Sequence, residues 1–533
     1  MKVKNVRIAT NDRISFTSVK QWYEDHLSPD VIDFDDQSAY QVYENARWAG
    51  IFQLTSQGAQ RLFKKAKPKN IIDIATLTSI YRPGPLAANV DKLYLEAKDG
   101  KMFDWGDDRI SEILAPTNGL LIFQEQVMLL AEKCAGFPKA QCDEVRRAIM
   151  KRSISGGAAA KKASQETRDS FVKGCIANGY TESVANNLYD KILYFAGYGF
   201  NKAHAVAYAI DSYWCAWLMT HYEEQWLTSY MESMSTTPEK RAKAFAEVKA
   251  LGYQIVPIDI NHATMSWTVL PGKRLMPSMT SVKGVGEAAV EELMSMRPFS
   301  SLEELLYNED GTWRLSKFNR KALEALIKVK AFDDVGCIGE DKLFKTYKHM
   351  YETLMGTYVE VVPKKKGSTE TVERVRDHAA LIKRSTKTDP HEGRKNLYEL
   401  ARALAPSCDV EWSRKELAEF RIEFFGSLDV LSMIDPLILN KLDEKQVISV
   451  DDLEQGDTQI CWFVIAGAVP KKTKTQKTYM QLHVIGPLGK THRLNVWGWK
   501  SEQTFSLYEL CFAEVKRDDY GCSTTSWKLK SLG

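Results

Sequence analysis

Residues 194–218, read YFAGYGFNKAHAVAYAIDSYWCAWL, place polar and aromatic side chains at helical spacing. A Gly-Tyr-Gly turn comes before a helix that begins near residue 201, and three side chains then share one helical face: Asn201, His204 and Tyr208. Lys202 stands at the N-terminal end of this helix, which favours anions. The face suits a nucleoside triphosphate with its base or sugar beside the aromatic ring. An ordinary buried helix with a polar cap would show the same pattern.

The sequence CDEVRRAIMKR forms a second candidate surface. Arg146 and Arg147 are adjacent, and Lys151 follows Arg147 by one helical turn. A guanidinium group binds phosphate oxygens in pairs, so this row is suited to a triphosphate. Asp143 and Glu144 could instead pair with the arginines inside the protein.

The sequence SVKGVGEAAVEELM, residues 281–294, places a Gly-Val-Gly turn before a helix. Its free backbone N–H groups can hold a DNA phosphate without reading sequence, and Lys283, Gly284 and Gly286 are the candidate contacts. The downstream segment KFNRKALEALI makes a tandem helix-hairpin-helix module the favoured interpretation. Its second hairpin is degenerate, since Val329 and Lys330 stand where a glycine is expected.

Two aspartates, Asp33 and Asp35, alternate with a phenylalanine in SPDVIDFDDQSAY. On a strand both carboxylates would point to one face, as the paired metal ions of nucleotidyl transfer require. An acidic linker would contain the same residues.

The C-terminal region, residues 455–533, has strand-like segments separated by turn residues. A basic loop between two of them, PKKTKTQKTY, is typical of a small OB-type barrel that tracks single-stranded nucleic acid, with these lysines as contacts: Lys471, Lys472 and Lys474. Tyr479 and Trp497 could stack on bases, although core packing is the commoner role of such rings.

The composition of the chain limits the classes of protein and of site that these patterns can indicate. With 44% hydrophobic and 26% charged residues the chain is an ordinary globular protein, and a net charge of +3 does not by itself announce nucleic-acid binding. The nine cysteines contain no CxxC pair, which argues against a zinc site or a disulfide framework. There is neither a signal peptide nor an apolar run of the ~18 residues that a bilayer span needs. We expect a cytoplasmic protein that does not bind membranes.

At 533 residues the chain needs several cores, so the sequence predicts a multidomain fold. The expected class is mainly α, with fingers and tandem helix-hairpin-helix parts and a C-terminal OB-like β-barrel. The expected divisions are a palm-remnant or linker segment (1–50), fingers (51–270), a hairpin module (271–335), a helical connector (336–450) with a charged, poorly ordered insert (363–395), and the barrel (451–533).

Several segments together resemble the alpha subunit of bacterial DNA polymerase III, the C-family replicative polymerase. The following occur in family order: GIFQLTSQGAQRLFKKAKP, ATLTSIYRPGPL, LLIFQEQVMLLAEKCAGF, EVRRAIMKR, FAGYGFNKAHAVAYAIDSYWCAWLMTHY, GYQIVPIDIN, VKGVG and NRKALEALIKVKAFD. The resemblance covers about residues 40–335, and more weakly 415–500 as the OB part.

The resemblance implies that the incoming dNTP contacts Arg146, Arg147, Lys151, Asn201, Lys202, His204 and Tyr208. It also implies that Gly284 and Gly286 hold the duplex backbone, and that Tyr81 and Arg82 lie near the base of the fingers. We count Arg82 among the DNA-binding residues. Two departures stand out: Thr55 replaces a family glutamate, and EDKLF (340–344) is a poor sliding-clamp motif.

In this family the catalytic aspartates belong to a palm domain upstream of FQL, and only about fifty residues precede FQL here. Asn5 stands where the last palm aspartate would align, and Asp33 and Asp35 fall in the family's acidic linker. We therefore expect no catalytic or metal-binding residue in this chain. We expect a split, phage-type polymerase whose separate palm-bearing chain holds Mg²⁺, with primer-template DNA, dNTP and a clamp as further partners. The alternatives are a minimal polymerase that uses Asp33 and Asp35, and a non-catalytic DNA-binding protein.

Overall fold

The computed structural model describes residues 16–28, 30–101, 103–155, 158–196, 199–235, 237–312, 314, 316–364, 369–425, 434, 436–473, 475–487, 491–518 and 521–531. For some of them, including residues 150–155 and 158–164, the description covers the backbone alone. The chain divides into two compact units, Met1–Trp226 and Leu227–Gly533. Each unit is described by itself.

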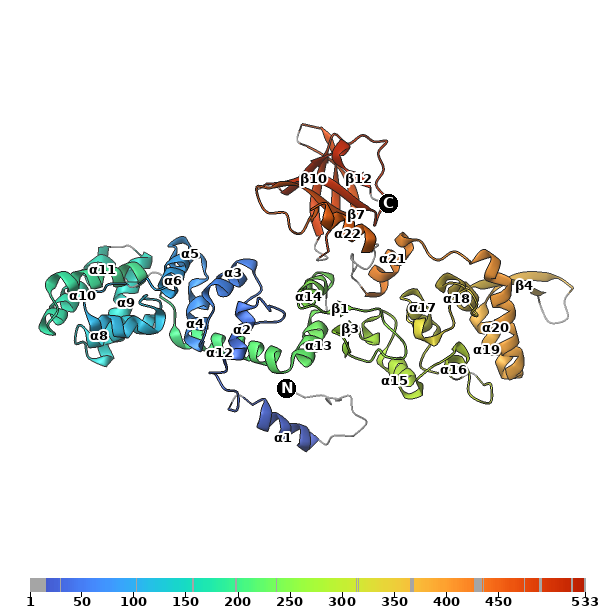
Figure 1. Ribbon diagram of the computed structural model, residues 1–533, viewed down its shortest axis with the longest axis horizontal. Coiled ribbons are helices and arrows are strands. Elements are labelled where there is room, and N and C mark those ends of the chain that lie inside the picture. Colours follow the sequence, from blue (N-terminus) through green and yellow to red (C-terminus); the bar gives the residue numbers. More distant parts are fainter. Residues whose placement is uncertain are drawn as a thin grey trace. The chain divides into compact units, whose positions relative to one another are not determined.

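The first unit is helical (Figure 1). Its helices are α1 (Phe16–His26), α2 (Gln37–Glu44), α3 (Gln57–Ala66), α4 (Ile71–Ile80), α5 (Pro83–Ala87), α6 (Val90–Lys98), α7 (Asp108–Leu114), α8 (Gln124–Lys133), α9 (Lys139–Ser155), α10 (Ala158–Ala177), α11 (Glu182–Ala196) and α12 (Lys202–His221). The helix α13 (Glu223–Met234) begins in this unit and ends in the next.

Helix α12 packs against α2 and α4 because one of its faces is made of small side chains. Ala205, Ala209, Ser212 and Ala216 are buried, and the Ser212 hydroxyl lies 3.1 Å from that of Tyr43 on α2. Close approach of helices is easiest where no large side chain intervenes. A second core is shared by helices α7, α8, α9, α10 and α11, the last four of which lie together in Figure 1. The first unit therefore holds two helical groups, with the turn before α12 between them in sequence.

The second unit begins with α14 (Pro238–Ala250) and a sheet of order β1-β3-β2. These strands are β1 (Gln254–Ile255), β2 (Thr268–Leu270) and β3 (Arg274–Met276). The following elements are α15 (Glu287–Met296), α16 (Leu302–Leu306), α17 (Arg320–Lys328), α18 (Tyr347–Met355), the hairpin β4 (Thr357–Pro363) and β5 (Thr371–Asp377), α19 (His378–Thr388), α20 (Pro390–Leu404), α21 (Arg414–Phe425) and α22 (Pro436–Glu444). One apolar core runs from residue 258 to residue 424. Residues 371–395, whose charged composition indicated poor order, form β5, α19 and the start of α20.

The C-terminal strands are β6 (Ile448–Ser449), β7 (Thr458–Lys472), β8 (Thr478–Ile485), β9 (Thr491–Trp497), β10 (Leu510–Asp518), β11 (Gly521–Thr525) and β12 (Lys530–Ser531). Strands β7, β8 and β9 pair in sequence, β9 pairs parallel with β11, β11 pairs with β10, and β10 returns to β7. This is a closed five-stranded barrel with the pairing order of an OB fold. A bulge between Ile465 and Gly467 lets the long strand β7 bend around it.

The predicted fold class, mainly α with a C-terminal OB-like barrel, is confirmed. Of the helices described, none combines the length and apolar content needed to cross a bilayer.

Candidate functional site

The residues before α12 are fixed by the segment that leads into α8. Phe200 pairs with Phe123 as an isolated bridge: the Phe200 N–H donates to Ile122 O (3.0 Å), and the Gln124 N–H donates to Phe200 O (2.9 Å). The buried side chain of Gln126 accepts from the N–H groups of Ile122 and Phe123 at 2.9 and 2.8 Å. The turn before α12 is therefore held by a segment about 75 residues earlier in the sequence.

Two side chains of the protein cap the N-terminus of α12. The Asn201 Oδ1 accepts from the His204 N–H at 2.8 Å, as an N-cap residue does. The Glu125 Oε2 accepts from the Lys202 N–H at 2.8 Å. The anion-favouring end of this helix thus already holds a carboxylate, so a phosphate that used the Lys202 amide would have to displace Glu125.

A row of rings follows the predicted face of α12. The ring centroids of Phe200 and His204 are 5.5 Å apart, those of His204 and Tyr208 are 4.2 Å apart, and Phe52 lies 5.3 Å from Tyr208. The Arg82 guanidinium carbon lies 4.2 Å from the Phe200 centroid, a cation–π arrangement. The sequence spacing identified His204 and Tyr208 as members of this row. It gave no reason to select Phe52, which comes from the FQL segment, or Phe200, which comes from the turn before α12.

The two arginines of α9 share one carboxylate. The Asp143 oxygens lie 2.7 Å from Arg146 Nη2 and 2.5 Å from Arg147 Nη2. The hydrogen bonds from Arg146 and then Arg147 lower the pKa of Asp143, so the carboxylate stays charged. The internal pairing that the sequence allowed is thus present, and the side chain of Lys151 lies outside the described residues.

Gln124 joins the arginines to the turn. Its Oε1 accepts from Arg146 Nη1 at 2.9 Å, and its Nε2 donates to Gly199 O at 3.0 Å. The side chain of Arg146 is 20% exposed, whereas that of Arg147 is 71% exposed. Arg146 is therefore held within the framework by Asp143 and Gln124, whereas Arg147 is more exposed and is paired with Asp143 alone among the described residues.

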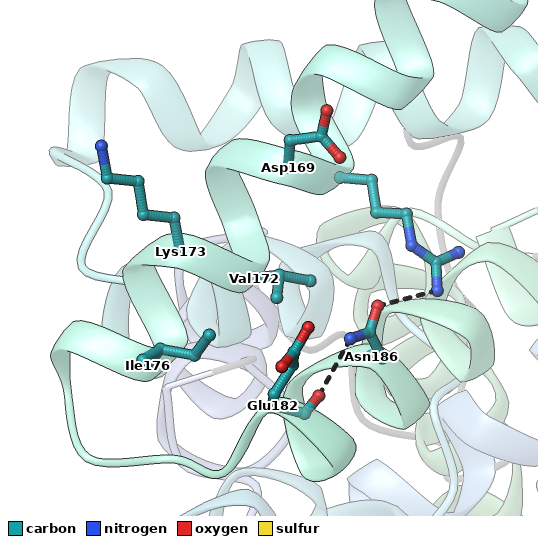
Figure 2. Close-up of a pocket in the computed structure, with 7 residues that line it drawn as sticks. Asp169, Val172, Lys173, Ile176, Glu182 and Asn186 are labelled. Carbon is teal, nitrogen blue, oxygen red and sulfur yellow. Dashed lines mark hydrogen bonds between the residues drawn. The ribbon is translucent and has the colours of Figure 1, made fainter.

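Described residues of this unit line a hollow beside α12 and another between α10 and α11. One of about 540 Å³ adjoins α12 and is lined by Glu125, Lys202, Ala203, Val206, Ala207 and Ile210. Another of about 330 Å³, between α10 and α11, is shown in Figure 2. In the second hollow Arg168 donates to Asn186 Oδ1 at 3.0 Å and pairs with Asp190 at 2.6 Å. Its remaining charges are of both signs, so we assign it no ligand.

The carboxylates of residues 31–36 lie in a turn, not on a strand. Asp33 Oδ1 accepts from the Asp35 N–H at 2.9 Å, and Asp36 caps α2 through the Ser38 N–H at 2.9 Å. The other Asp36 oxygen lies 2.6 Å from His221 Nε2, at the last residue of α12. Burial opposes the charged form, but the hydrogen bonds from Ser38 and His221 lower the pKa of Asp36. Asp33 thus stabilises the turn, and Asp36 joins the start of α2 to the end of α12.

The second unit has one group with metal-ligand chemistry among the residues that the structure describes: Asp259, His262 and Asp334. The His262 Nδ1 lies 2.8 Å from Asp259 Oδ1 and 3.3 Å from Asp334 Oδ2. His262 Nδ1 is thus within hydrogen-bonding distance of both carboxylates, and the buried Oδ2 of Asp259 has no hydrogen-bond partner among the described residues.

The first predicted hairpin is present and exposed. Gly284 has φ of +101°, and a Cβ there would lie 3.2 Å from the Lys321 side chain. Gly286 has an ordinary φ of −90°, caps α15 and has open space around it. Among the described residues, no acceptor takes the N–H of Gly286 or of Glu287. Lys283 is exposed, and its backbone N–H donates to Phe424 O at 2.8 Å.

In the second hairpin, the lysine at the expected glycine position contacts other side chains of the protein. Lys330 adopts φ of +62°, the conformation for which a glycine is expected. Its Nζ lies 3.2 Å from Glu411 and above the ring of Tyr347. In the weak clamp motif EDKLF (340–344), Phe344 is buried, so its ring is not available to a sliding clamp.

The predicted barrel residues come together at one end. Lys471 pairs with Tyr479 across β7 and β8, and the Tyr479 and Trp497 rings lie 4.6 Å apart. Trp497 is 40% exposed, so its ring is not part of the barrel core. Lys472 is exposed beside them, and Lys474 lies outside the described residues.

Residues 13–179 match the family model of the bacterial DNA polymerase III alpha subunit finger domain. Residues 252–340 match the helix-hairpin-helix motif. The first match includes the acidic turn of residues 31–36 and the arginines of α9, and the second includes both hairpins.

Among curated proteins, the DNA polymerase III subunit alpha of Pseudomonas aeruginosa is 32% identical over 335 residues, 60% of this chain and 28% of that protein. Those of Bacillus subtilis and Aquifex aeolicus are also 32% identical, over 318 and 311 residues, which are 59% and 57% of this chain and 27% and 25% of those proteins. The matches thus span about a quarter of these relatives. The chain carries a C-terminal alpha-subunit-like part, with finger and helix-hairpin-helix domains.

Proposed function

We propose, from this similarity to the C-terminal part of the polymerase III alpha subunit, that the chain supplies the fingers, hairpin and OB parts of a C-family replicative DNA polymerase. It binds the incoming dNTP and the primer-template, and a separate palm-bearing chain completes the enzyme. The observation that carries the proposal is the junction at Gln124, which joins the arginine helix α9 to the turn before α12.

In the nucleotide step, Arg147 and Lys202 bring positive charge to the triphosphate while Arg146 is held by Gln124 and Asp143. Lys151 would extend this row by one turn. The ring row of His204 and Tyr208 offers a surface for the base or sugar, and Asn201 sets the start of α12. Such a site binds by charge and stacking and leaves the bond-making groups to the partner.

In the DNA steps, the exposed amides beyond Gly284 and Gly286 receive a duplex phosphate, with Lys283 adding charge. We propose that Arg82, which lies above the ring of Phe200, contacts the end of the duplex at the base of the fingers. The barrel end with Lys471, Lys472 and, by sequence, Lys474 would track the single-stranded template. A sliding clamp remains a proposed partner without a matching exposed motif.

Catalysis needs Mg²⁺, which activates the primer hydroxyl and neutralises the leaving pyrophosphate. Because the matched family model is that of the finger domain, we propose that a separate palm-bearing chain holds the ions. A rival proposal is a minimal polymerase that uses Asp33 and Asp35. Another is a non-catalytic DNA-binding protein.

The test begins with co-purification from the native source and mass spectrometry of the proteins that accompany the chain. The complex is then assayed for primer extension with Arg147→Ala plus Lys202→Ala in this chain. We expect a loss of at least tenfold in kcat/KM for dNTP, because two phosphate contacts disappear. The matched control, Arg61→Ala plus Lys133→Ala, removes the same charges elsewhere in the first unit. Equal extension by both double variants contradicts the nucleotide-binding role.

A further inference from the structure

The exposed hairpin Val282–Gly286 is held from outside by helix α21. The Lys283 N–H donates to the carbonyl oxygen of Phe424, 2.8 Å away, in the last turn of that helix. The Lys283 amide is thus hydrogen-bonded to a helix about 140 residues later in the sequence, and the direction of this N–H depends on the position of α21.

A lysine of α17 contacts two aromatic side chains of α21, a helix that also packs Phe424 into the apolar core. The Lys328 Nζ, at the end of α17, lies 5.1, 5.0 and 5.6 Å from the ring centroids of Tyr351, Phe420 and Phe424. Glu324, one turn earlier on α17, accepts from it at 2.9 Å. The Lys328 side chain is 14% exposed, and cation–π attraction is strongest where water is excluded. Burial opposes its charge, but the hydrogen bond to Glu324 raises the pKa of Lys328, so it stays protonated.

The same helix reaches the barrel. Ala418, near the middle of α21, shares a buried cluster with Trp462 and Val464 of β7 and Leu510 of β10. Helix α21 therefore contacts both of the modules that we propose to bind DNA.

We infer that α21 sets the hairpin in its phosphate-binding geometry, with Lys328 and Phe424 as positioning residues that do not touch DNA themselves. A phosphate is held by several amides at once, each needing an N···O distance near 3 Å, so a small movement of the turn weakens the contact. The inference rests on the proposed duplex-binding role of the hairpin.

The experiment measures duplex affinity of the full chain by titrating a fluorescent 20-base-pair duplex at several salt concentrations. Lys328→Met removes the charge and keeps the unbranched stem. We expect about five- to tenfold weaker binding with a nearly unchanged slope of log K against log salt, because the weakened contact is made by uncharged amides and not by a cation. Lys328→Arg, which keeps a cation among the rings, should bind within twofold of the wild type.

Two further variants separate the possible failures. Lys395→Met makes the same change at a 70% exposed position on α20 and should leave affinity and slope unchanged. Gly286→Asp should weaken binding if the hairpin contacts DNA at all. Weakening by Gly286→Asp but not by Lys328→Met overturns the inference and leaves the proposed function standing. No weakening by either variant contradicts duplex binding by the hairpin.

Hydrogen exchange gives a readout independent of DNA. In Lys328→Met the Lys283 amide, which donates to Phe424 O, should exchange at least tenfold faster, while those of α15 and the barrel strands keep their rates. If Lys328→Met does not fold, Phe424→Leu, which keeps the backbone carbonyl, is measured in the same way. Unchanged hairpin exchange in a folded variant contradicts the positioning role.

Discussion

Gln124 Oε1 accepts a hydrogen bond from Arg146 Nη1 at 2.9 Å, so the first residue of α8 orients a guanidinium on α9. The same side chain donates to Gly199 O at 3.0 Å, in the turn before α12. One amide thus sets the relative placement of the arginine helix and the ring row.

Replacing this amide should weaken nucleotide binding without unfolding the unit. Gln124→Leu removes both hydrogen bonds, and a hydrogen bond to a charged group is worth about 1.5–3 kcal/mol. We expect the KM for dNTP of the reconstituted enzyme to rise about tenfold, with circular dichroism unchanged. Gln124→Glu keeps an acceptor for Arg146 and should retain more affinity. Equal KM values for Gln124→Leu and the wild type would show that Arg146 needs no such support.

Substitutions of the two hairpin glycines should differ in their effects on stability and on duplex binding. Gly284→Ala forces φ of +101° on a side chain and crowds Lys321, so it should cost about 1–2 kcal/mol of stability. Gly286→Asp has open space and an N-cap position, so its melting temperature should be kept or raised. Its carboxylate would face a phosphate and should weaken duplex binding several-fold, whatever the sequence. Thermal melts and salt titrations separate the two effects. Full affinity in Gly286→Asp would mean that no phosphate lies there.

The acidic turn predicts a pH dependence of stability. Because the pKa of Asp36 is lowered in the folded state, its contribution is complete above its unfolded pKa of 3.8 and is lost as pH falls through the lower folded value. Asp36→Asn keeps an N-cap oxygen but replaces a charged acceptor of hydrogen bonds with a neutral one, so it should reduce the free energy of unfolding by about 1 kcal/mol at pH 7. The difference from the wild type should shrink below about pH 4. Denaturant unfolding at several pH values measures it, and a difference independent of pH would rule out the charged carboxylate as its source.

The barrel end should bind single strands by stacking. Trp497→Ala should weaken binding of an oligothymidylate by about 1–3 kcal/mol, the usual worth of one stacked base. Trp412→Ala removes a buried tryptophan of the connector and serves as the control for a loss that is purely structural. Fluorescence anisotropy gives both affinities. Unchanged affinity in a folded Trp497→Ala would leave this ring a structural role alone.

Local spacing was enough to predict several features. The row of His204 and Tyr208, the turn at Gly284 and the strands around the basic loop each depend on a few neighbouring residues. The fold class followed from such segments taken in order.

Contacts between distant segments could not be predicted in this way. Gln124 is 75 residues from Gly199, and nothing in the local pattern distinguishes it from any surface glutamine. The contacts of Glu125 with the start of α12 and of Phe424 with the hairpin also join segments that are distant in the sequence. The sequence did indicate that Asp143 could pair with the arginines, because helical spacing alone decides that contact.

The most direct test of the central claim is primer extension by the purified chain alone, with primed template, the four dNTPs and Mg²⁺. If the chain needs a palm-bearing partner, as we propose, it should bind duplex DNA by itself but extend no primer until the palm-bearing chain is added. Template-directed extension by the chain alone that disappears in Asp33→Ala would contradict it.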